Sequence, residues 1–160
     1  MPKPLTIEAV GDRQLVITRD FDGPRDLVWL CYTKPELLRR WYGLPDWQMT
    51  VCDIDLRVGG KWRFVSVSPG GYEMASQGIY TLIDEPRQVD QTEAYDDNWT
   101  GGETINELRL DALGDGRTRT ITTVTYATPE ARAGAAASPM ADGMEIGFKR
   151  LDQLVAEETT

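Results

Sequence analysis

The side chains most able to do chemistry in this chain are carboxylates, because the sequence contains no histidine. Without imidazole, the Ser-His-Asp and Cys-His nucleophile systems are excluded, and so are imidazole metal sites. No acidic cluster has the spacing of a calcium loop, and no phosphate-binding glycine loop or dinucleotide fingerprint occurs. We therefore expect no metal and no cofactor, and any catalysis would fall to Asp, Glu, Tyr, Lys, Arg or a thiol.

Glu93 is the first candidate for contact with a ligand. It alternates with Val89, Gln91 and Tyr95 along a predicted strand, so these four side chains share one face of a sheet. If that face points inward, the carboxylate lies in apolar surroundings, its pKa rises, and it could bind an amine or act as an acid. If the register is shifted by one residue, Glu93 lies in solvent. The sequence alone allows both arrangements.

Asp55 and Arg57 form a second candidate pair, because alternate residues of a strand share a face. They could present two charges to a ligand. They could also form a structural ion pair beside the Gly59-Gly60 turn. We favour the structural pair, since ion pairs on sheets are common and contribute little.

An antiparallel sheet is expected to position these side chains. Residues 15–21 read as a strand, with 5–10 as a candidate first part of it. Six further strand-like segments follow, separated in nearly every case by turns that contain Gly or Pro; they lie at 49–58, 61–68, 77–84, 88–95, 104–112 and 117–126. Such short connections favour neighbouring antiparallel strands. We predict a curved sheet of about six or seven strands.

Short helices are expected between these strands and at the end of the sheet. Pro24 opens one after the first strand. Residues 33–36 (TKPE) have the capping-box pattern, in which the Thr33 hydroxyl would accept a hydrogen bond from the amide of Glu36, so a second helix should cover about 34–42. Thr128 is predicted to cap a third short helix.

A long helix from about 140 to 157 is predicted to cover the sheet, since its apolar residues recur at helical spacing and form one stripe. Gly143 and Gly147 lie near this stripe, and glycine in a helix costs about 1 kcal/mol relative to alanine. The glycines either allow close backbone approach or leave space for a ligand, and the two explanations can hold at different positions.

Large rings and two methionines from several elements could line an apolar pocket beneath this helix, although each ring could equally be part of a filled core. The residues predicted to contact a ligand are Trp41, Trp47, Trp62, Phe64, Tyr80, Glu93, Met140, Met144 and Phe148.

Length and charge set the class of protein. The 160 residues suit a single domain, 1–160, with its core at about 14–156. A net charge of −9 argues against binding to nucleic acid or to an anionic membrane. No signal peptide or membrane-length apolar run is apparent, and Cys31 and Cys52 are expected to be reduced and buried. We expect a cytoplasmic protein, and the oligomeric state stays open, with a homodimer as one alternative.

Several segments in a shared order resemble one known family. They are FDGPRDLVW at 21–29, TKPELLRRWY at 33–42, DLRVGGKW at 55–62, GIY at 78–80, PR at 86–87, TE at 92–93 and the closing helix at 142–154. On these segments the chain resembles the heat-shock-protein-90 ATPase activator homologue branch of the START/SRPBCC superfamily. The resemblance runs from about Ile17 to Val155.

This resemblance implies an α+β helix-grip fold, as in the pollen-allergen and START proteins, with a curved antiparallel sheet around a long C-terminal helix and two short helices after the first strand. Superfamily members bind lipids, hormones or polyketides in a cavity, a few catalyse cyclisation or dehydration, and the eukaryotic founder activates a chaperone ATPase. Our first expectation is binding of a hydrophobic or amphipathic small molecule without chemistry. The alternatives are a cyclase- or hydrolase-type enzyme using Glu93 or Asp55, and a chaperone-partner module.

Overall fold

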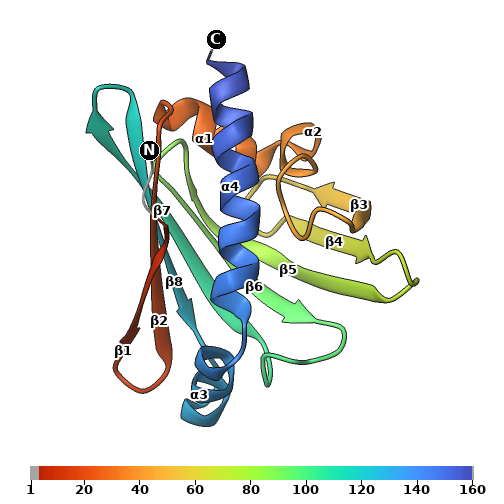
Figure 1. Cartoon of the computed structure of the whole chain (residues 1–160). Helices are drawn as coiled ribbons and strands as arrows, with labels where there is room; N and C mark the ends of the chain where they lie inside the picture. Colours follow the sequence, from red (N-terminus) through yellow and green to blue (C-terminus); the bar gives the residue numbers. More distant parts are fainter. Residues whose placement is uncertain (1–3, 160) are drawn as a thin grey trace.

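The computed structural model describes residues 4–159 and wraps a curved sheet around one long helix (Figure 1). Within these residues the sheet has eight strands in the order β1-β2-β8-β7-β6-β5-β4-β3, and each neighbouring pair is antiparallel. The strands are β1 (Thr6–Val10), β2 (Gln14–Phe21), β3 (Gln48–Ile54), β4 (Lys61–Val67), β5 (Glu73–Asp84), β6 (Gln88–Tyr95), β7 (Thr104–Gly114) and β8 (Arg117–Thr125). The predicted helix-grip fold is confirmed, with one strand more than expected.

The additional strand is β1, which the sequence suggested was the first part of β2. Gly11 has a φ of 58° in the turn between them, a conformation that glycine adopts without steric cost. The chain reverses there, and Thr6 pairs with Thr18. β2 pairs with β8 on its other side, so the first hairpin adds two strands to the edge of the meander formed by β3 to β8.

β2 shows how the sequence builds the concave face of the sheet. Burial alternates along the whole strand, and Leu15, Ile17, Arg19 and Phe21 are its buried residues. Successive side chains of a strand point to opposite faces, so these four share the inner face. Three of them are apolar, but Arg19 brings a positive charge into the interior and needs a partner there.

α4 (Met140–Glu158) crosses the concave face and is covered unevenly along its length (Figure 1). Its C-terminal half buries Phe148, Leu151, Leu154 and Val155 in the core. Its N-terminal half, which includes Met140 and Met144, is only half-buried. Within the described part of the chain, no helix is both long and apolar enough to cross a membrane. α4 is therefore an amphipathic cover that is anchored most firmly at its C-terminal end.

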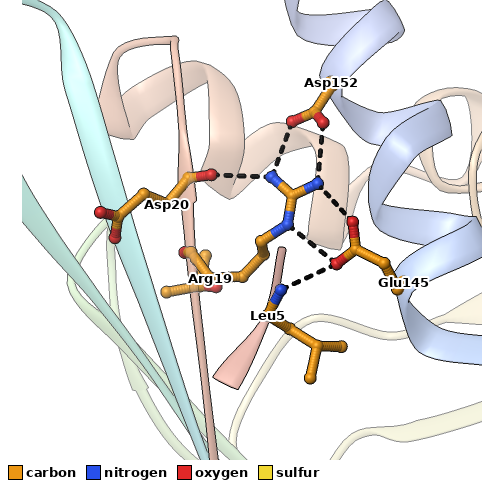
Figure 2. Close-up of polar contacts among 6 residues, drawn as sticks. Leu5, Arg19, Asp20, Glu145 and Asp152 are labelled. Atoms are coloured by element: carbon orange, nitrogen blue, oxygen red, sulfur yellow. Dashed lines mark hydrogen bonds and ion pairs between the residues drawn. The ribbon is translucent and has the colours of Figure 1, made fainter. Parts of the chain in front are cut away.

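Arg19 joins β2 to two turns of α4 (Figure 2). Its guanidinium is 2% exposed; it donates to Glu145 at 3.0 and 3.1 Å and to Asp152 at 2.8 and 3.0 Å. Glu145 also accepts a hydrogen bond of 2.9 Å from the backbone amide of Leu5. Burial alone would lower the pKa of Arg19, but the hydrogen bonds and charges of Asp152 and Glu145 raise it above its ordinary value. This cluster could not be predicted from the spacing of its residues in the sequence.

The shorter helices are α1 (Arg25–Thr33), α2 (Pro35–Leu38) and α3 (Pro129–Ala137). The capping-box prediction is wrong, because Thr33 is the last residue of α1 and its hydroxyl donates to the Trp29 carbonyl at 2.8 Å. α2 begins without a side-chain cap and ends at Leu38, four residues earlier than predicted. The cap at Thr128 is confirmed, since its hydroxyl accepts from the Ala131 amide at 3.0 Å.

Candidate functional site

Five of the predicted ligand-contacting residues are packed together in the core, each less than 10% exposed; they are Trp41, Trp62, Phe64, Tyr80 and Phe148. The Trp41 indole stacks on Phe148, with ring centroids 6.2 Å apart, and its Nε1 donates to the Cys31 carbonyl at 2.9 Å. Trp62 lies against Phe64 at 4.7 Å, and its Nε1 is buried without a partner among the described residues. These rings form an aromatic wall between the sheet and α4.

Met140 and Met144 lie on the N-terminal half of α4 and pack against the edge of this core. The Tyr126 hydroxyl donates to the Met140 sulfur at 3.7 Å. Trp47 is separate from the cluster, because it precedes the edge strand β3 and contacts the ring of Tyr72 at 5.9 Å. Tyr72 is itself largely exposed, so Trp47 belongs to the rim of the sheet.

Glu93 points to the inner face of the sheet, which resolves the register that the sequence left open. Val89, on the same face of β6, is part of the core. Across the strands, Glu93 pairs with the buried Thr104, and Gln91 pairs with Asn106. The Asn106 side chain forms a hydrogen bond with the Glu93 carboxylate.

The Glu93 side chain is half-buried, and among the described residues no opposite charge affects its pKa. Burial raises its pKa above the ordinary value, and the hydrogen bond from Asn106 offsets only part of that rise. Among residues 4–159, no Lys or Arg contributes to the pKa of Glu93. A buried carboxylate normally has an ionic partner, so this one either takes up a proton or awaits a partner from outside the chain.

Three tyrosines lie close enough to Glu93 for its charge to affect them. Tyr95 is two residues further along β6, Tyr42 follows α2, and Tyr126 follows β8. Burial is the main cause that raises the pKa of each, and the Glu93 charge adds to it; the pKa of Tyr126 rises to about 12. Tyr42 and Tyr95 are hydrogen-bonded to each other. All three phenols are therefore protonated at neutral pH and can donate hydrogen bonds.

Sequence reasoning found part of this polar group. Tyr95 shares the strand face of Glu93 and is visible from the alternation of β6. Tyr42, Asn106 and Tyr126 come from three other parts of the chain, and only the folded sheet brings them to the same carboxylate. We call Tyr42, Glu93, Tyr95, Asn106 and Tyr126 the polar group.

The two glycines of α4 serve different purposes. A Cβ added to Gly147 would lie 3.3 Å from the Trp41 carbonyl oxygen, so this glycine allows the backbones to approach closely. Gly143 is one turn earlier on the same side of the helix, where a Cβ would meet nothing within 4 Å. The space next to Gly143 is open, although the residue is only partly exposed. Close approach and open space thus both occur, at different positions.

Two measurable hollows lie away from these residues. One, of about 110 Å³, is lined by Arg40, Arg150, Gln153, Leu154 and Glu157. The other, of about 190 Å³, lies at the turn between β1 and β2. Neither contains a residue predicted to contact a ligand.

Asp55 and Arg57 lie in the turn after β3, with a carboxylate oxygen 2.9 Å from the Arg57 Nε. Both side chains are at least half exposed, so the preferred interpretation as a structural ion pair is confirmed. Asp55 is too exposed to act as a buried acid.

The thiols show no sign of a reactive or metal-binding role. Cys31 and Cys52 are buried and not disulfide-bonded, as predicted. Burial raises the pKa of the Cys31 thiol to about 11, which keeps it in the unreactive neutral form. Over residues 4–159, no three His, Cys, Asp or Glu side chains are grouped in a way that could hold a metal ion.

A family model described as "Activator of Hsp90 ATPase homolog 1-like protein" matches residues 22–156. The chain belongs to this family. The resemblance seen in the sequence is therefore confirmed, and the fold of the activator-homolog family is a ligand-binding scaffold. Among curated proteins, none matches the chain.

Solved structures of other proteins share the fold of this chain. A protein of Rhodobacter sphaeroides is 34% identical, covers 97% of this chain and 99% of its own, and superposes with a TM-score of 0.91. A Mycobacterium smegmatis protein is 26% identical, with coverages of 95% and 97% and a TM-score of 0.80. The AHSA1 protein of Silicibacter pomeroyi, at 20% identity, with coverages of 91% and 99% and a TM-score of 0.72, shows the shared fold.

Proposed function

We propose that this protein binds a hydrophobic or amphipathic small molecule between the concave face of the sheet and the N-terminal half of α4. The observation that carries the proposal is the polar group, in which Tyr42 contacts Phe64 of the aromatic wall and Tyr126 contacts Met140 on the half-buried part of α4. An apolar body would contact the rings, and a polar end would reach the carboxylate and the phenols. Sites for small molecules have this composition, mostly apolar with a few convergent polar groups.

The polar group makes the interior less stable, and this cost in stability supports the proposal. A half-buried carboxylate without a counter-charge, together with phenols that are partly or fully withdrawn from water, weakens a core unless these polar groups are satisfied. A protein that needed only a filled interior would be more stable with apolar residues at these positions. A ligand that completes the hydrogen bonds of these polar residues would offset their cost in stability.

The N-terminal half of the covering helix α4 provides a route for a ligand to enter. Met140 and Met144 have flexible side chains that can repack around a ligand, and the open space at Gly143 lies between them along the helix. Arg19 holds α4 in place through its ion pairs with Glu145 and Asp152, a contact that we call the Arg19 clasp. We expect ligand entry to displace the first turn of α4 while the rest of the helix stays in place.

Native mass spectrometry after mild purification tests the proposal, together with tryptophan fluorescence during titration with a library of lipids and aromatic compounds. We expect a retained ligand mass or a saturable change in fluorescence. Gly143→Phe fills the open space and should reduce binding at least tenfold. The matched control is Gly134→Phe, since Gly134 lies in α3, is exposed, and also has nothing within 4 Å of its Cβ position.

If Gly143→Phe fails to fold, Met144→Trp serves as the second obstructing variant. Absence of any ligand mass and of any saturable fluorescence change in the wild-type protein would count against the proposal. Equal binding by the wild type and by a folded obstructing variant would do the same.

An enzyme is the second candidate, because the inward carboxylate of Glu93 has a raised pKa and could donate a proton to a bound substrate. The reaction would be of the cyclase or hydrolase type. Turnover of a library substrate that is lost in Glu93→Gln, with ligand binding retained, would favour the enzyme over the pure binding protein.

The family description provides a third candidate, a partner that stimulates a chaperone ATPase. It predicts that the protein is captured by a heat-shock-protein-90 chaperone and raises its rate of ATP hydrolysis. Failure of both assays would remove this candidate and leave the binding proposal unaffected.

A further inference from the structure

We infer that the ligand carries a protonated amine, which pairs with the Glu93 carboxylate at the base of the site. This inference rests on the proposed function and specifies the chemical class of the ligand. It follows from the surroundings of Glu93, from the rings beside it and from the charge of the molecule.

The surroundings of Glu93 lack a cation. Glu93 pairs with Thr104 across β6 and β7, and its carboxylate receives a side-chain hydrogen bond from Asn106, which leaves acceptor positions unused. The titratable groups whose pKa its charge affects are the phenols of Tyr42, Tyr95 and Tyr126, from three different parts of the fold. An ammonium group would supply the missing positive charge and donate to the unused oxygen positions.

The rings near Glu93 favour the same kind of ligand. Tyr42 lies against Phe64 with centroids 5.4 Å apart, and Phe64 lies against Trp62 at 4.7 Å. The aromatic wall therefore reaches the polar group through Tyr42. Faces of aromatic rings attract cations, and edges and faces together accommodate an apolar body. A carboxylate beside such a wall suits an aromatic or aliphatic amine better than it suits an anion.

The charge of the whole molecule acts in the same direction. With a net charge of −9, the protein attracts cations and repels carboxylates and phosphates at a distance. An anionic ligand such as a fatty acid would also meet the Glu93 charge at close range. These two repulsions separate the amine from the other amphipathic ligands that the fold could enclose.

Three probes with the same apolar body and different polar ends test the inference: naphthalen-2-ylmethanamine, naphthalen-2-ylmethanol and 2-naphthoate. Each is titrated into the wild type, Glu93→Gln and Asp90→Asn by isothermal titration calorimetry at pH 7.5 in 150 mM salt, a condition that screens surface charge. Asp90 is the matched control, because it is a carboxylate on the opposite face of β6.

We expect the amine to bind the wild type at least tenfold more tightly than the alcohol, and 2-naphthoate to bind most weakly. Glu93→Gln should reduce the preference for the amine to within about twofold, whereas Asp90→Asn should retain it. In the wild type, the amine alone should lose affinity as the pH is lowered, because protonation of Glu93 removes the charge that it binds.

Each other outcome has a defined meaning. Equal binding of amine and alcohol, tighter binding of 2-naphthoate, or an amine preference that survives Glu93→Gln would overturn the inference and leave the proposed function in place. If none of the three probes binds at millimolar concentration, the inference is rejected, and so is an apolar site large enough to hold a naphthalene ring. Circular dichroism and thermal unfolding of Glu93→Gln establish that the variant is folded.

Discussion

At the scale of single residues, Glu93 is the position where the stability of the fold and the proposed function make opposite demands. Its carboxylate is half-buried, and partial loss of contact with water raises its pKa. Ionising it in the folded protein therefore costs more than ionising it in the unfolded chain. This cost applies wherever the folded protein holds Glu93 in its ionised form.

Glu93→Gln should stabilise the protein at neutral pH. Because the folded-state pKa of Glu93 is raised, its contribution to stability is present below the unfolded-state pKa of about 4.3 and is lost as the pH rises through the folded-state value. Glutamine cannot ionise, so its advantage should be largest at pH 7.5 and should shrink towards pH 4. Urea unfolding at both pH values measures this, with Asp90→Asn as the control; a wild type more stable than Glu93→Gln at pH 7.5 would contradict it.

The orientation of Glu93 also marks a limit of prediction from sequence. The alternation of β6 showed that Glu93, Gln91 and Tyr95 share a face, since this depends only on local geometry. Which face points inward depends on the pairing of β6 with β7 and on the packing of the folded core. For the same reason, the sequence could not assign Tyr42 and Tyr126 to the polar group, because their neighbours in space are remote in sequence.

At the scale of elements, α4 is packed tightly into the core along its C-terminal half and less tightly along its N-terminal half. Apolar side chains anchor its C-terminal half, and the clasp of Arg19 reaches it at Glu145 and Asp152. The two acids are seven residues apart, about two helical turns, so one guanidinium fixes the rotation as well as the position of the helix. The long helix could be predicted from its spacing, but the clasp could not, because a single arginine in an alternating strand does not reveal its partner.

Arg19→Met should destabilise the protein by about 3 kcal/mol, because it leaves two partly buried carboxylates without their cation. Arg119→Met is the matched control; Arg119 pairs with Asp20 but is 45% exposed, so its loss should cost less than about 1 kcal/mol. Guanidinium unfolding of both variants gives the comparison. Equal losses of stability would contradict the role assigned to the clasp.

The same cluster predicts sensitivity to acid. Burial alone would raise the pKa of Glu145, but the hydrogen bonds from Arg19 and Leu5 hold it below its ordinary value. Stability from this carboxylate is therefore present above the unfolded-state pKa of about 4.3 and is lost as the pH falls through the folded-state value. The wild type should lose stability over this range by more than Arg19→Met does, as thermal unfolding from pH 6 to pH 3 would show; parallel curves would contradict the prediction.

The glycines of α4 provide a second comparison within one helix. Gly143→Ala should stabilise the protein by up to about 1 kcal/mol, since alanine favours helix and the added methyl group meets open space. Gly147→Ala should gain less or lose stability, because its methyl group would press on the Trp41 carbonyl oxygen at 3.3 Å. Urea unfolding of the two variants ranks them, and the reverse order would show that the space lies beneath Gly147.

At the scale of the whole molecule, the sheet curves around α4 and carries the polar group on its inner face. The antiparallel meander from β3 to β8 and the covering helix follow from turn residues and helical spacing and were predicted from the sequence, whereas the separate strand β1 and the place of β2 beside β8 were not. The shape of the interior depends on how rings from different strands pack, and that information is spread over the whole chain. Trp47 illustrates this, since its type suggested a ligand contact and its position in the fold places it against Tyr72.

The most direct test is a crystal structure of the protein soaked with naphthalen-2-ylmethanamine. We predict density for the probe beneath the N-terminal half of α4, with its nitrogen about 2.7–3.2 Å from a Glu93 carboxylate oxygen and the Met140 and Met144 side chains repacked around its rings. Density only in the surface hollow beside Arg40 and Glu157, or an interior that stays filled at saturating probe, would contradict the proposal that this protein holds a ligand between sheet and helix.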